Sequence, residues 1–380
     1  MINILYCIPG LYNPGGMERI LTEKANYLAN QPDFKIHILT TDQKNKDVFY
    51  QLSSKILIKH LNLDFDQYFD KPILEKFFKI KKIQKNYRNI LKEYIVNNKI
   101  DIIVSLGGKE LDFLYKLDVD CKKICELHFS INIREQFMLA RGNNLKNKLI
   151  GKYRTFQLIK QTKLLNYLVV LTKSDQEKLQ KTHNNVLQIY NFSSFSPEEK
   201  SNLNNKVIVA VGKLDPQKGF DLLIEACKNI NNWNGWQLHI YGQGPDKQKL
   251  ENMVKKNNLK EYIYFKGITH NLGEVYNNAS FFVLSSRYEG FPMVLLEAIS
   301  FGLPIVAFDC ETGPNEIIKN NDCGILVENG NTVQLGIKME DMIHNHSLII
   351  QKSIASFSKA KDFSKEYIME QWISLFKSLN

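Results

Sequence analysis

The stretch SFFVLSSRYEGFPMVLLEAISFGLPIVAF, residues 280–308, contains a strand, a helix and a second strand in succession. Segments 280–285 and 304–308 are short and largely apolar, as is typical of strands buried on both faces of a parallel sheet. Between them, 292–302 has the length and apolar spacing of a helix. This one unit predicts a parallel sheet that is covered by helices.

The same alternation extends along the whole chain of 380 residues. Further strand candidates lie at 2–8, 34–40, 101–106, 123–127, 167–172, 206–212, 236–242, 262–267 and 324–327. Two such series predict an α/β protein with two doubly wound, Rossmann-like domains facing across a cleft. The polar segment 193–205 is the predicted linker, which gives domains at 1–195 and 196–365.

Charge is divided unevenly between these two halves. Residues 1–195 hold 31 Lys and Arg against 19 Asp and Glu, a net +12, and residues 196–380 hold 19 against 21, a net −2. Twenty-two Phe and 17 Tyr exclude a disordered chain. No apolar run approaches the ~18–20 residues of a membrane-spanning helix. The first residues, MINILYCIPG, predict a strand and no secretory signal.

The six cysteines include no CxxC pair, and they predict neither a disulfide framework nor a metal site. We therefore expect a cytoplasmic protein with reduced thiols. The turn GQGPDK at 242–247 lacks the third glycine of a dinucleotide fingerprint, which argues against a nicotinamide-dependent oxidoreductase.

Two glutamates, Glu289 and Glu297, flank the predicted start of a helix. Pro292 suits the first helical turn, because its missing N–H needs no partner there. The N–H groups that would point out of the helix start belong to Phe291, Met293 and Val294. Such a helix start favours an anion such as a diphosphate, and the carboxylates would then accept hydrogen bonds from sugar hydroxyls. A solvated pair of glutamates is the alternative.

A basic turn follows another predicted strand of the same domain. The turn GKLDPQKG, residues 212–219, carries Lys213 and Lys218. Ligands of open parallel sheets bind at the carboxyl ends of the strands, so these lysines are placed to contact the same diphosphate. A solvent-exposed turn without function is again the alternative.

Residues 289–318, EGFPMVLLEAISFGLPIVAFDCETGPNEII, resemble the family 4 glycosyltransferases, which are retaining enzymes of the GT-B fold. Glu289 and Glu297 reproduce the E-x7-E motif of that family. Lys213 departs from the family pattern, which usually has an arginine there, and it keeps the charge without the bidentate geometry. Further segments that fit the family are GGMER (15–19), GQGP (242–245), YFKGIT (264–269) and GILV (324–327).

The resemblance implies metal-independent, retaining transfer of a hexose or N-acetylhexosamine from a UDP-sugar, with no cofactor. It implies catalytic roles for Glu289, Lys218 and His128, and a structural role for Asn191. The residues that it assigns to the nucleotide sugar are Gly15, Gly16, Lys213, Lys218, Gly242, Gly267, Ile268, Glu289, Gly290, Phe291, Pro292, Met293, Val294 and Glu297. By the same resemblance, a C-terminal helix at 366–380 crosses back to the first domain.

The resemblance further implies that the first domain receives the acceptor, often a lipid-linked glycan, in the synthesis of a surface polysaccharide. Two other functions stay open. One is a nucleotide-sugar 2-epimerase of the same architecture, which would isomerise or release the sugar without an acceptor. The other is a nucleotide-sugar-binding protein that has lost catalysis.

Two basic stretches have amphipathic spacing. Residues 71–92 hold eight Lys and Arg against one acid, and residues 141–163 hold seven against none. Their apolar residues at helical spacing are Ile73, Phe77, Ile80, Ile83, Tyr87, Ile90 and Leu91, and then Leu149, Tyr153, Phe156 and Ile159. Either these stripes pack on the sheet, or the first domain rests on the anionic inner face of the cell membrane. No nucleic-acid-binding motif is present, so nucleic acid is not an expected partner.

Overall fold

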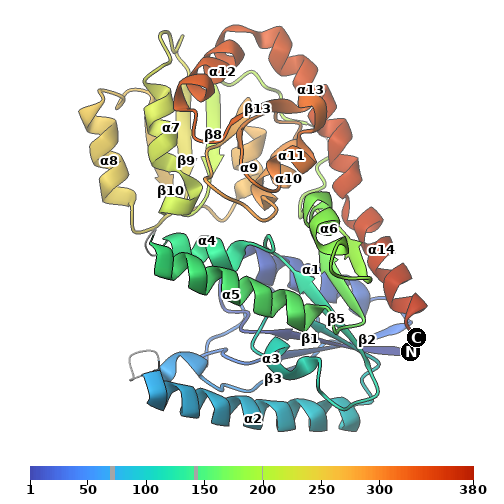
Figure 1. Cartoon of the computed structure of the whole chain (residues 1–380). Helices are drawn as coiled ribbons and strands as arrows, with labels where there is room; N and C mark the ends of the chain where they lie inside the picture. The colour runs from blue at the N-terminus through green and yellow to red at the C-terminus, as the bar shows by residue number, and fades with distance from the viewer. Residues whose placement is uncertain (69–72, 141–143, 199) are drawn as a thin grey trace. The chain divides into compact units, whose positions relative to one another are not determined.

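The structure, a computed structural model, describes residues 1–68, 73–140, 144–198 and 200–380. The chain forms two compact units, one of Met1–Tyr190 with Ile368–Asn380 and the other of Asn191–Tyr367. Each unit is built on one parallel sheet with helices on both faces (Figure 1). This confirms the predicted α/β class with two Rossmann-like sheets.

The sheet of the first unit has seven strands in the order β3-β2-β1-β4-β5-β6-β7. They are β1 (Ile2–Ile8), β2 (Phe34–Thr40), β3 (Leu57–His60), β4 (Ile102–Ser105), β5 (Lys122–Leu127), β6 (Tyr167–Val170) and β7 (Val186–Gln188). Neither β3 nor β7 is predicted from the sequence. Both are short edge strands, all four residues of β3 are exposed, and the apolar stretches 56–58 and 186–187 are only three and two residues long.

The helices of the first unit lie on both faces of this sheet (Figure 1). They are α1 (Gly16–Ala29), η1 (Phe65–Tyr68), α2 (Ile73–Asn97), α3 (Leu111–Leu114), α4 (Ile133–Ala140), α5 (Leu145–Thr162), α6 (Lys173–Gln180) and the end of α14 (Lys365–Ser378). On one face Leu5 and Cys7 of β1 share a core with Tyr87 and Leu91 of α2. On the other, Phe376 of α14 packs edge-on against Phe34 of β2.

The sheet of the second unit has six strands in the order β10-β9-β8-β11-β12-β13. They are β8 (Val207–Val211), β9 (Gln237–Tyr241), β10 (Ile263–Gly267), β11 (Phe281–Leu284), β12 (Ile305–Asp309) and β13 (Gly324–Glu328). From β8 the chain adds β9 and β10 on one side, and it then adds β11, β12 and β13 on the other side of β8. The order of strands therefore switches between β8 and β11, which is where ligands of such parallel sheets bind.

The second unit also has helices on both faces of its sheet (Figure 1). They are η2 (Pro216–Lys218), α7 (Phe220–Cys227), α8 (Lys247–Lys256), α9 (Leu272–Asn277), α10 (Met293–Ser300), α11 (Pro314–Ile317), η3 (Lys319–Asn321), α12 (Thr332–His344), α13 (His346–Ala360) and η4 (Lys361–Phe363). Within the described part of the chain, no helix is both long enough and apolar enough to cross a membrane.

Candidate active site

Two loops at the carboxyl ends of the neighbouring strands β8 and β11 are tied together. The guanidinium of Arg287 donates two hydrogen bonds of 2.8 Å to the carboxylate of Asp221. The N–H of Arg287 donates to the carbonyl of Gln217 at 2.9 Å, and the amide of Gln217 donates to the carbonyl of Tyr288 at 3.2 Å. The hydrogen bonds from Arg287 lower the pKa of Asp221. The loop after β8 and the loop after β11 are thus held in one arrangement.

Glycine is needed where these loops approach one another through their backbones. Gly219 has φ +62°, and a Cβ there would lie 2.1 Å from the carbonyl oxygen of Ser285. Gly242 has φ +137°, and a Cβ there would lie 1.9 Å from the carbonyl oxygen of Gly212. Both contacts are far below van der Waals distance, so only glycine fits either position.

Lys218 and Glu289 meet at this edge of the sheet, although 71 residues separate them. The Lys218 Nζ lies 2.6 Å from Glu289 Oε1, and the hydroxyl of Ser286 donates to the same oxygen at 2.6 Å. The Lys218 side chain is 20 % exposed and that of Glu289 is 7 % exposed. The pair is therefore half-enclosed, with the lysine on the more accessible side.

A third loop supports the segment that carries Glu289. The hydroxyl of Thr312, in the loop after β12, donates to the carbonyl oxygen of Glu289. Gly313 has φ +99°, and a Cβ there would meet Pro292 at 2.4 Å. The carbonyl oxygen of Gly290 would lie 3.3 Å from the same Cβ. The predicted binding residues at 289–292 are thus held by packing on the loop after β12.

The helix after this segment is α10, and its start lies one residue beyond the prediction. Pro292 has ψ +96° and forms the N-cap, so the first helical residue is Met293. The N–H of Leu295 donates to the carbonyl of Pro292 at 2.9 Å. The N–H groups of Met293 and Val294 have no acceptor within the helix, since no helical carbonyl precedes the first turn. Phe291 is buried beside Phe363.

Glu297 lies inside α10, and its side chain is turned into the unit. It is buried, and the hydroxyl of Tyr276 donates to its Oε2 at 2.7 Å. Tyr276 comes from α9 and was not predicted to contribute. An aromatic residue in a short helix carries no sequence signal for such a role.

The remaining predicted residues of this unit are more open. Lys213 is 68 % exposed, with its Nζ 3.7 Å from Asp215, and the structure does not bring it into the Lys218–Glu289 pair. The carbonyl of Gly267, at the end of β10, accepts a 2.7 Å hydrogen bond from the N–H of Gly242. Ile268 follows it and is 59 % exposed. Asn191 is buried, and its side-chain amide lies 3.4 Å from the sulfur of Met293.

The predicted glycine turn of the first unit forms the start of α1. Gly15 is the N-cap, and Gly16 is the first residue of this 14-residue helix. A Cβ on Gly15 would lie 2.2 Å from a carboxylate oxygen of Glu18, which leaves no room for a larger residue without a shift. The carboxylate of Glu18 thus lies beside the N-terminal end of α1.

His128 ends a buried chain of charged groups in the first unit. Its Nε2 lies 3.1 Å from Glu126 Oε1, and the Lys24 Nζ lies 2.5 Å from that same oxygen. The ammonium of Lys24 also lies 3.7 Å from the ring centroid of Trp372 in α14. Burial raises the pKa of Glu126, but Lys24 and then His128 lower it, and the balance leaves it at about 2. Glu126 is thus a carboxylate held ionised in the core.

Lys24, Glu126 and Trp372 were missed from the sequence. One signal was present: Glu126 lies inside the otherwise apolar strand run KICEL, where an unpaired charge would be costly. The partner, Lys24, lies 102 residues away in a helix whose periodicity gave no reason to bury it. Arg287 and Asp221 were missed for a similar reason, because their pairing spans 66 residues.

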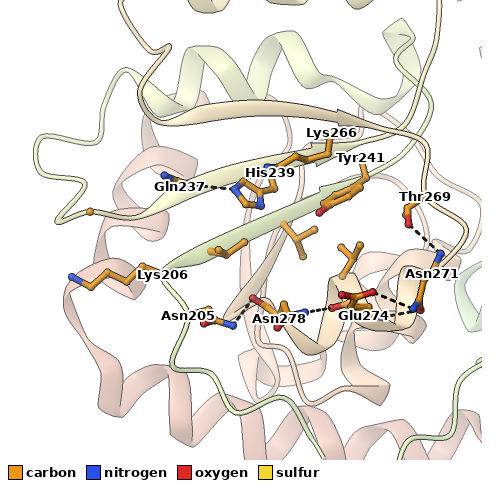
Figure 2. Close-up of a pocket in the computed structure, with 14 residues that line it drawn as sticks. Asn205, Lys206, Gln237, His239, Tyr241, Lys266, Thr269, Asn271, Glu274 and Asn278 are labelled. Atoms are coloured by element: carbon orange, nitrogen blue, oxygen red, sulfur yellow. Dashed lines mark hydrogen bonds between the residues drawn. The ribbon is translucent and has the colours of Figure 1, made fainter.

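A polar cavity of about 560 Å³ lies on the second unit's sheet, beside β8, β9 and α9 (Figure 2). Hydrogen bonds join residues of its lining, as Figure 2 shows: His239 with Gln237 and Asn271 with Glu274 through their side chains, the N–H of Asn271 with the hydroxyl of Thr269, and the amide of Asn205 with the backbone carbonyl of Asn278. Burial and then Lys266 lower the pKa of His239 to about 4. None of the predicted site residues lines this cavity.

Comparison with known proteins agrees with this geometry. Residues 191–361 match the family model described as glycosyl transferases group 1. The amylovoran biosynthesis glycosyltransferase AmsD of Erwinia amylovora is 29 % identical over 98 % of this chain and 99 % of its own length. A Campylobacter jejuni α-1,4-N-acetyl-D-galactosaminyltransferase is 26 % identical over 99 % of this chain and 98 % of its own.

Among solved structures, Staphylococcus aureus TarM superposes with a TM-score of 0.77 at 18 % identity, over 99 % of this chain and 100 % of that one. This likeness concerns the fold. With the two parallel sheets, the family match and the full-length relatives support a glycosyltransferase of the GT-B fold.

Proposed function

We propose that this chain is a retaining glycosyltransferase of family 4 that moves a hexose or N-acetylhexosamine from a UDP-sugar to a glycan acceptor. The observation that carries the proposal is the meeting of Lys218 and Glu289 beside the start of α10. It places a mobile cation, a carboxylate and free backbone N–H groups at one edge of a parallel sheet. These are the groups that a sugar diphosphate requires.

In this proposal the diphosphate binds to Lys218 and to the N–H groups of Met293 and Val294. Lys213, which is exposed, turns inward to add a second positive charge. Lys218 must exchange its bond to Glu289 for one to phosphate, which frees the carboxylate to accept hydrogen bonds from the sugar. Glu297 keeps its bond from Tyr276 and offers its remaining lone pairs to the ribose hydroxyls.

The leaving group is then stabilised by these cations and dipoles, so no metal or other cofactor is needed. In the transfer step the bond from the anomeric carbon to the diphosphate oxygen breaks with its electron pair on that oxygen. The acceptor hydroxyl forms the new bond on the same face of the sugar, and its proton passes to the diphosphate oxygen. No side chain has to become covalently attached.

The proposal gives His128 a contact with the donor sugar, as the family resemblance implies. Within the first unit, the neighbouring Glu126 carboxylate orients the imidazole through Nε2. With its Nε2–H directed at this carboxylate, a neutral imidazole can accept a hydrogen bond from a sugar hydroxyl at Nδ1. We assign Glu126 no direct contact with the substrate, because its side chain is only 1 % exposed.

The relatives support an acceptor that belongs to a surface glycan. AmsD is named for amylovoran biosynthesis, and the Campylobacter enzyme is named for a glycan attached to PP-undecaprenol. TarM has been solved with UDP and α-GlcNAc-glycerol. By analogy, we propose a UDP-sugar donor and a lipid-linked glycan acceptor for this chain.

We also propose that the first unit docks on an anionic membrane through α5. The predicted stretches 71–92 and 141–163 begin at 71–72 and 141–143, which lie outside the described residues. In α2 the predicted stripe largely packs on the core, since Tyr87 and Leu91 are buried. In α5 it does not: Leu149, Tyr153 and Phe156 are all at least 60 % exposed.

The exposed stripe of α5, defined here as Leu145, Leu149, Tyr153 and Phe156, lies among basic side chains. The described ones on this helix are Lys146, Lys148, Lys152, Arg154 and Lys160. An apolar stripe with basic flanks is suited to lie in the interface of an anionic bilayer. The first two turns of α2 add the exposed Phe77 and Phe78.

A panel of nucleotide sugars tests the donor assignment. We expect a UDP-sugar to raise the melting temperature of the full chain and to be hydrolysed slowly, with the α-anomer released first when an α-linked donor is used. NMR of the fresh product reports that anomer. Release of the opposite anomer would contradict retention. A C2-epimerised sugar formed without acceptor would establish the epimerase, and binding without any turnover would establish an inactive binding protein.

A further inference from the structure

A second cavity, of about 670 Å³, lies entirely in the first unit. It opens at the carboxyl ends of β1, β2 and β4, where Pro9, Thr41 and Gly107 line it. Carboxyl ends of parallel strands are where ligands of such sheets bind. Two helices close one side of the cavity, α4 through Arg134 and α5 through Arg154 and Gln157.

The two arginines of this cavity lie against each other. Nη1 of Arg134 donates to the backbone carbonyl of Arg154 at 3.2 Å, and Nη1 of Arg154 lies 3.8 Å from the sulfur of Met138. Among the described residues, neither guanidinium forms an ion pair with a carboxylate. Burial lowers the pKa of Arg134, nearby Asp112 counteracts this, and the positive charge of Arg154 lowers it further.

Three acids line the cavity, Glu18, Asp42 and Asp112, and among the described residues none of them forms an ion pair with either arginine. Asp112 accepts hydrogen bonds from the amides of Gln84 at 2.6 Å and Gln161 at 3.1 Å. Asp42 accepts from the hydroxyl of Thr41 at 2.6 Å and from the N–H of Phe65 at 2.9 Å. Both carboxylates are thus committed to neutral donors. The positive charge of Arg154 disfavours that of Arg134, and an anion bound between them would offset this repulsion.

This cavity differs from the polar cavity of the second unit. There, the side chains of His239 and Gln237 bond to each other, as do those of Asn271 and Glu274, as the dashed lines of Figure 2 show. Here, Arg134 and Arg154 line the space, and neither forms an ion pair with a described carboxylate. A guanidinium matches the geometry of a phosphate and binds it through two parallel hydrogen bonds.

The exposed stripe of α5 adjoins the same cavity. The side-chain amide of Gln157, which lines the cavity, donates to the hydroxyl of Tyr153 at 3.1 Å. Tyr153 belongs to the stripe. A ligand that carries both a phosphate and a hydrocarbon chain could therefore meet the arginines and the stripe at once.

We propose that Arg134 and Arg154 bind the phosphate or diphosphate group of an amphiphilic acceptor, whose hydrocarbon chain lies along the exposed stripe of α5. This rests on the proposed function, because it assigns the acceptor of that glycosyltransferase. It specifies the acceptor's chemistry: a sugar linked to a lipid through phosphate, in preference to a neutral glycan or a neutral glycolipid.

Binding of farnesyl diphosphate tests this site directly. We expect saturable binding to the full chain by calorimetry, with farnesol and inorganic diphosphate each binding at least tenfold more weakly. Arg134→Gln and Arg154→Gln should each weaken farnesyl diphosphate binding roughly tenfold to a hundredfold, because each removes a charged hydrogen-bond donor. Lys181→Gln, at the exposed end of α6 in the same unit, is the control for a lost charge and should leave it unchanged.

Saturating UDP separates this site from the proposed donor site. Farnesyl diphosphate should still bind when UDP is present, and UDP affinity should be the same in the arginine variants and the parent. Farnesyl diphosphate binding that UDP abolishes, or that neither arginine variant weakens, would overturn the proposal. If only the donor assignment is wrong, the parent protein will not bind UDP but will still bind farnesyl diphosphate.

Thermal melting and vesicle binding complete the test of the two arginines. Melting of each variant shows whether it is folded, and Arg154 is exposed, so its replacement should not unfold the chain. Anionic vesicles should bind Arg134→Gln as well as the parent, because the half-buried Arg134 serves the acceptor's phosphate and not bilayer headgroups. Vesicle binding lost together with farnesyl diphosphate binding in Arg134→Gln would instead assign the site to lipid headgroups and overturn the proposal.

Discussion

The ammonium of Lys24 lies 2.5 Å from the carboxylate of Glu126, and both side chains are at most 2 % exposed. The ring of Trp372 covers the ammonium on another side, 3.7 Å away. A buried ion pair of this kind need not stabilise the fold relative to an apolar pair, but removing one partner leaves an uncompensated charge. This makes the pair sensitive to single substitutions.

Replacing Lys24 with methionine should lower the free energy of unfolding by about 3–5 kcal/mol, because Glu126 loses its nearest cation. Urea denaturation of the full chain measures this. The double variant Lys24→Met with Glu126→Leu should recover most of the loss. Lys92→Met is the matched control, since its ion pair with Asp118 is exposed and 3.9 Å long. If the single and double variants are equally unstable, the loss comes from packing and not from charge.

The stability that Glu126 contributes should depend on pH. Its pKa in the folded chain is about 2, below the ordinary 4.5, so its contribution is complete above 4.5 and is lost as the pH falls toward 2. We expect the urea midpoint to fall between pH 5 and pH 3, and to fall less steeply in Glu126→Gln. Parallel pH curves for the two proteins would show that the carboxylate is not held ionised.

Lys218 and Glu289 should separate binding from transfer. Lys218→Ala removes the cation that the diphosphate would contact, so we expect UDP affinity to fall roughly tenfold or more. Glu289→Gln keeps the shape but loses the charge, and should reduce transfer at least about a hundredfold while UDP affinity stays near that of the parent. Lys256→Ala, on the exposed face of α8, is the control for lost charge. Unchanged UDP affinity in Lys218→Ala would refute the diphosphate assignment.

Gly219→Ala should damage the site through the backbone. A Cβ at this position would lie 2.1 Å from the carbonyl of Ser285, and its φ of +62° adds strain. Gly330→Ala isolates the strain, since Gly330 has φ +83° with nothing within 4 Å of its Cβ position. We expect Gly330→Ala to cost about 1–2 kcal/mol and Gly219→Ala at least about 2 kcal/mol more, with loss of UDP binding. If thermal denaturation shows the same loss of stability for Gly219→Ala and Gly330→Ala, the loop after β11 can move aside to admit the Cβ.

Membrane docking should depend on the exposed stripe of α5. Leu149→Ser with Phe156→Ser removes apolar surface that contributes nothing to the core, so we expect unchanged thermal stability and reduced sedimentation with anionic vesicles. Ile159→Ser is the contrasting variant: Ile159 packs against the core, so its replacement should lower stability. Equal sedimentation with neutral and anionic vesicles would contradict an electrostatic contribution.

The fold was largely predictable because near-continuous apolar strands alternate with helices. The exceptions have physical causes. β3 and β7 are short edge strands, and the apolar stretches at 56–58 and 186–187 are only three and two residues long. In α5 the apolar stripe points outward, because the face that packs inward includes the small residues Gly151, Thr155 and Thr162. A Cβ on Gly151 would lie 2.7 Å from the Cα of Glu135 in α4. The close packing of α5 against α4 therefore decides which face of α5 is buried, and the hydrophobic pattern alone does not predict it.

The candidate site was predictable to the extent that its residues lie at strand ends. Lys218 and Glu289 each follow a recognisable strand, so their shared edge of the sheet could be expected. Their direct pairing could not, since it depends on the register of β8 with β11. Arg154 belongs to the basic stretch 141–163 and Arg134 to neither basic stretch, so no sequence pattern links them. The structure brings them together, and neither forms an ion pair with a described carboxylate.

The position of α14 has a consequence for biosynthesis. The first unit consists of Met1–Tyr190 and Ile368–Asn380, so two parts of one domain are separated by all of the second. During translation, at ~5–20 residues per second, the first part waits on the order of ten seconds or more for Trp372 and Phe376 to emerge. Until then the ammonium of Lys24 has no aromatic ring against it, and the face of β2 at Phe34 stays exposed to solvent. The domain that is synthesised first is thus the last to be completed, and a nascent chain stalled before α14 should be the form that chaperones and proteases find.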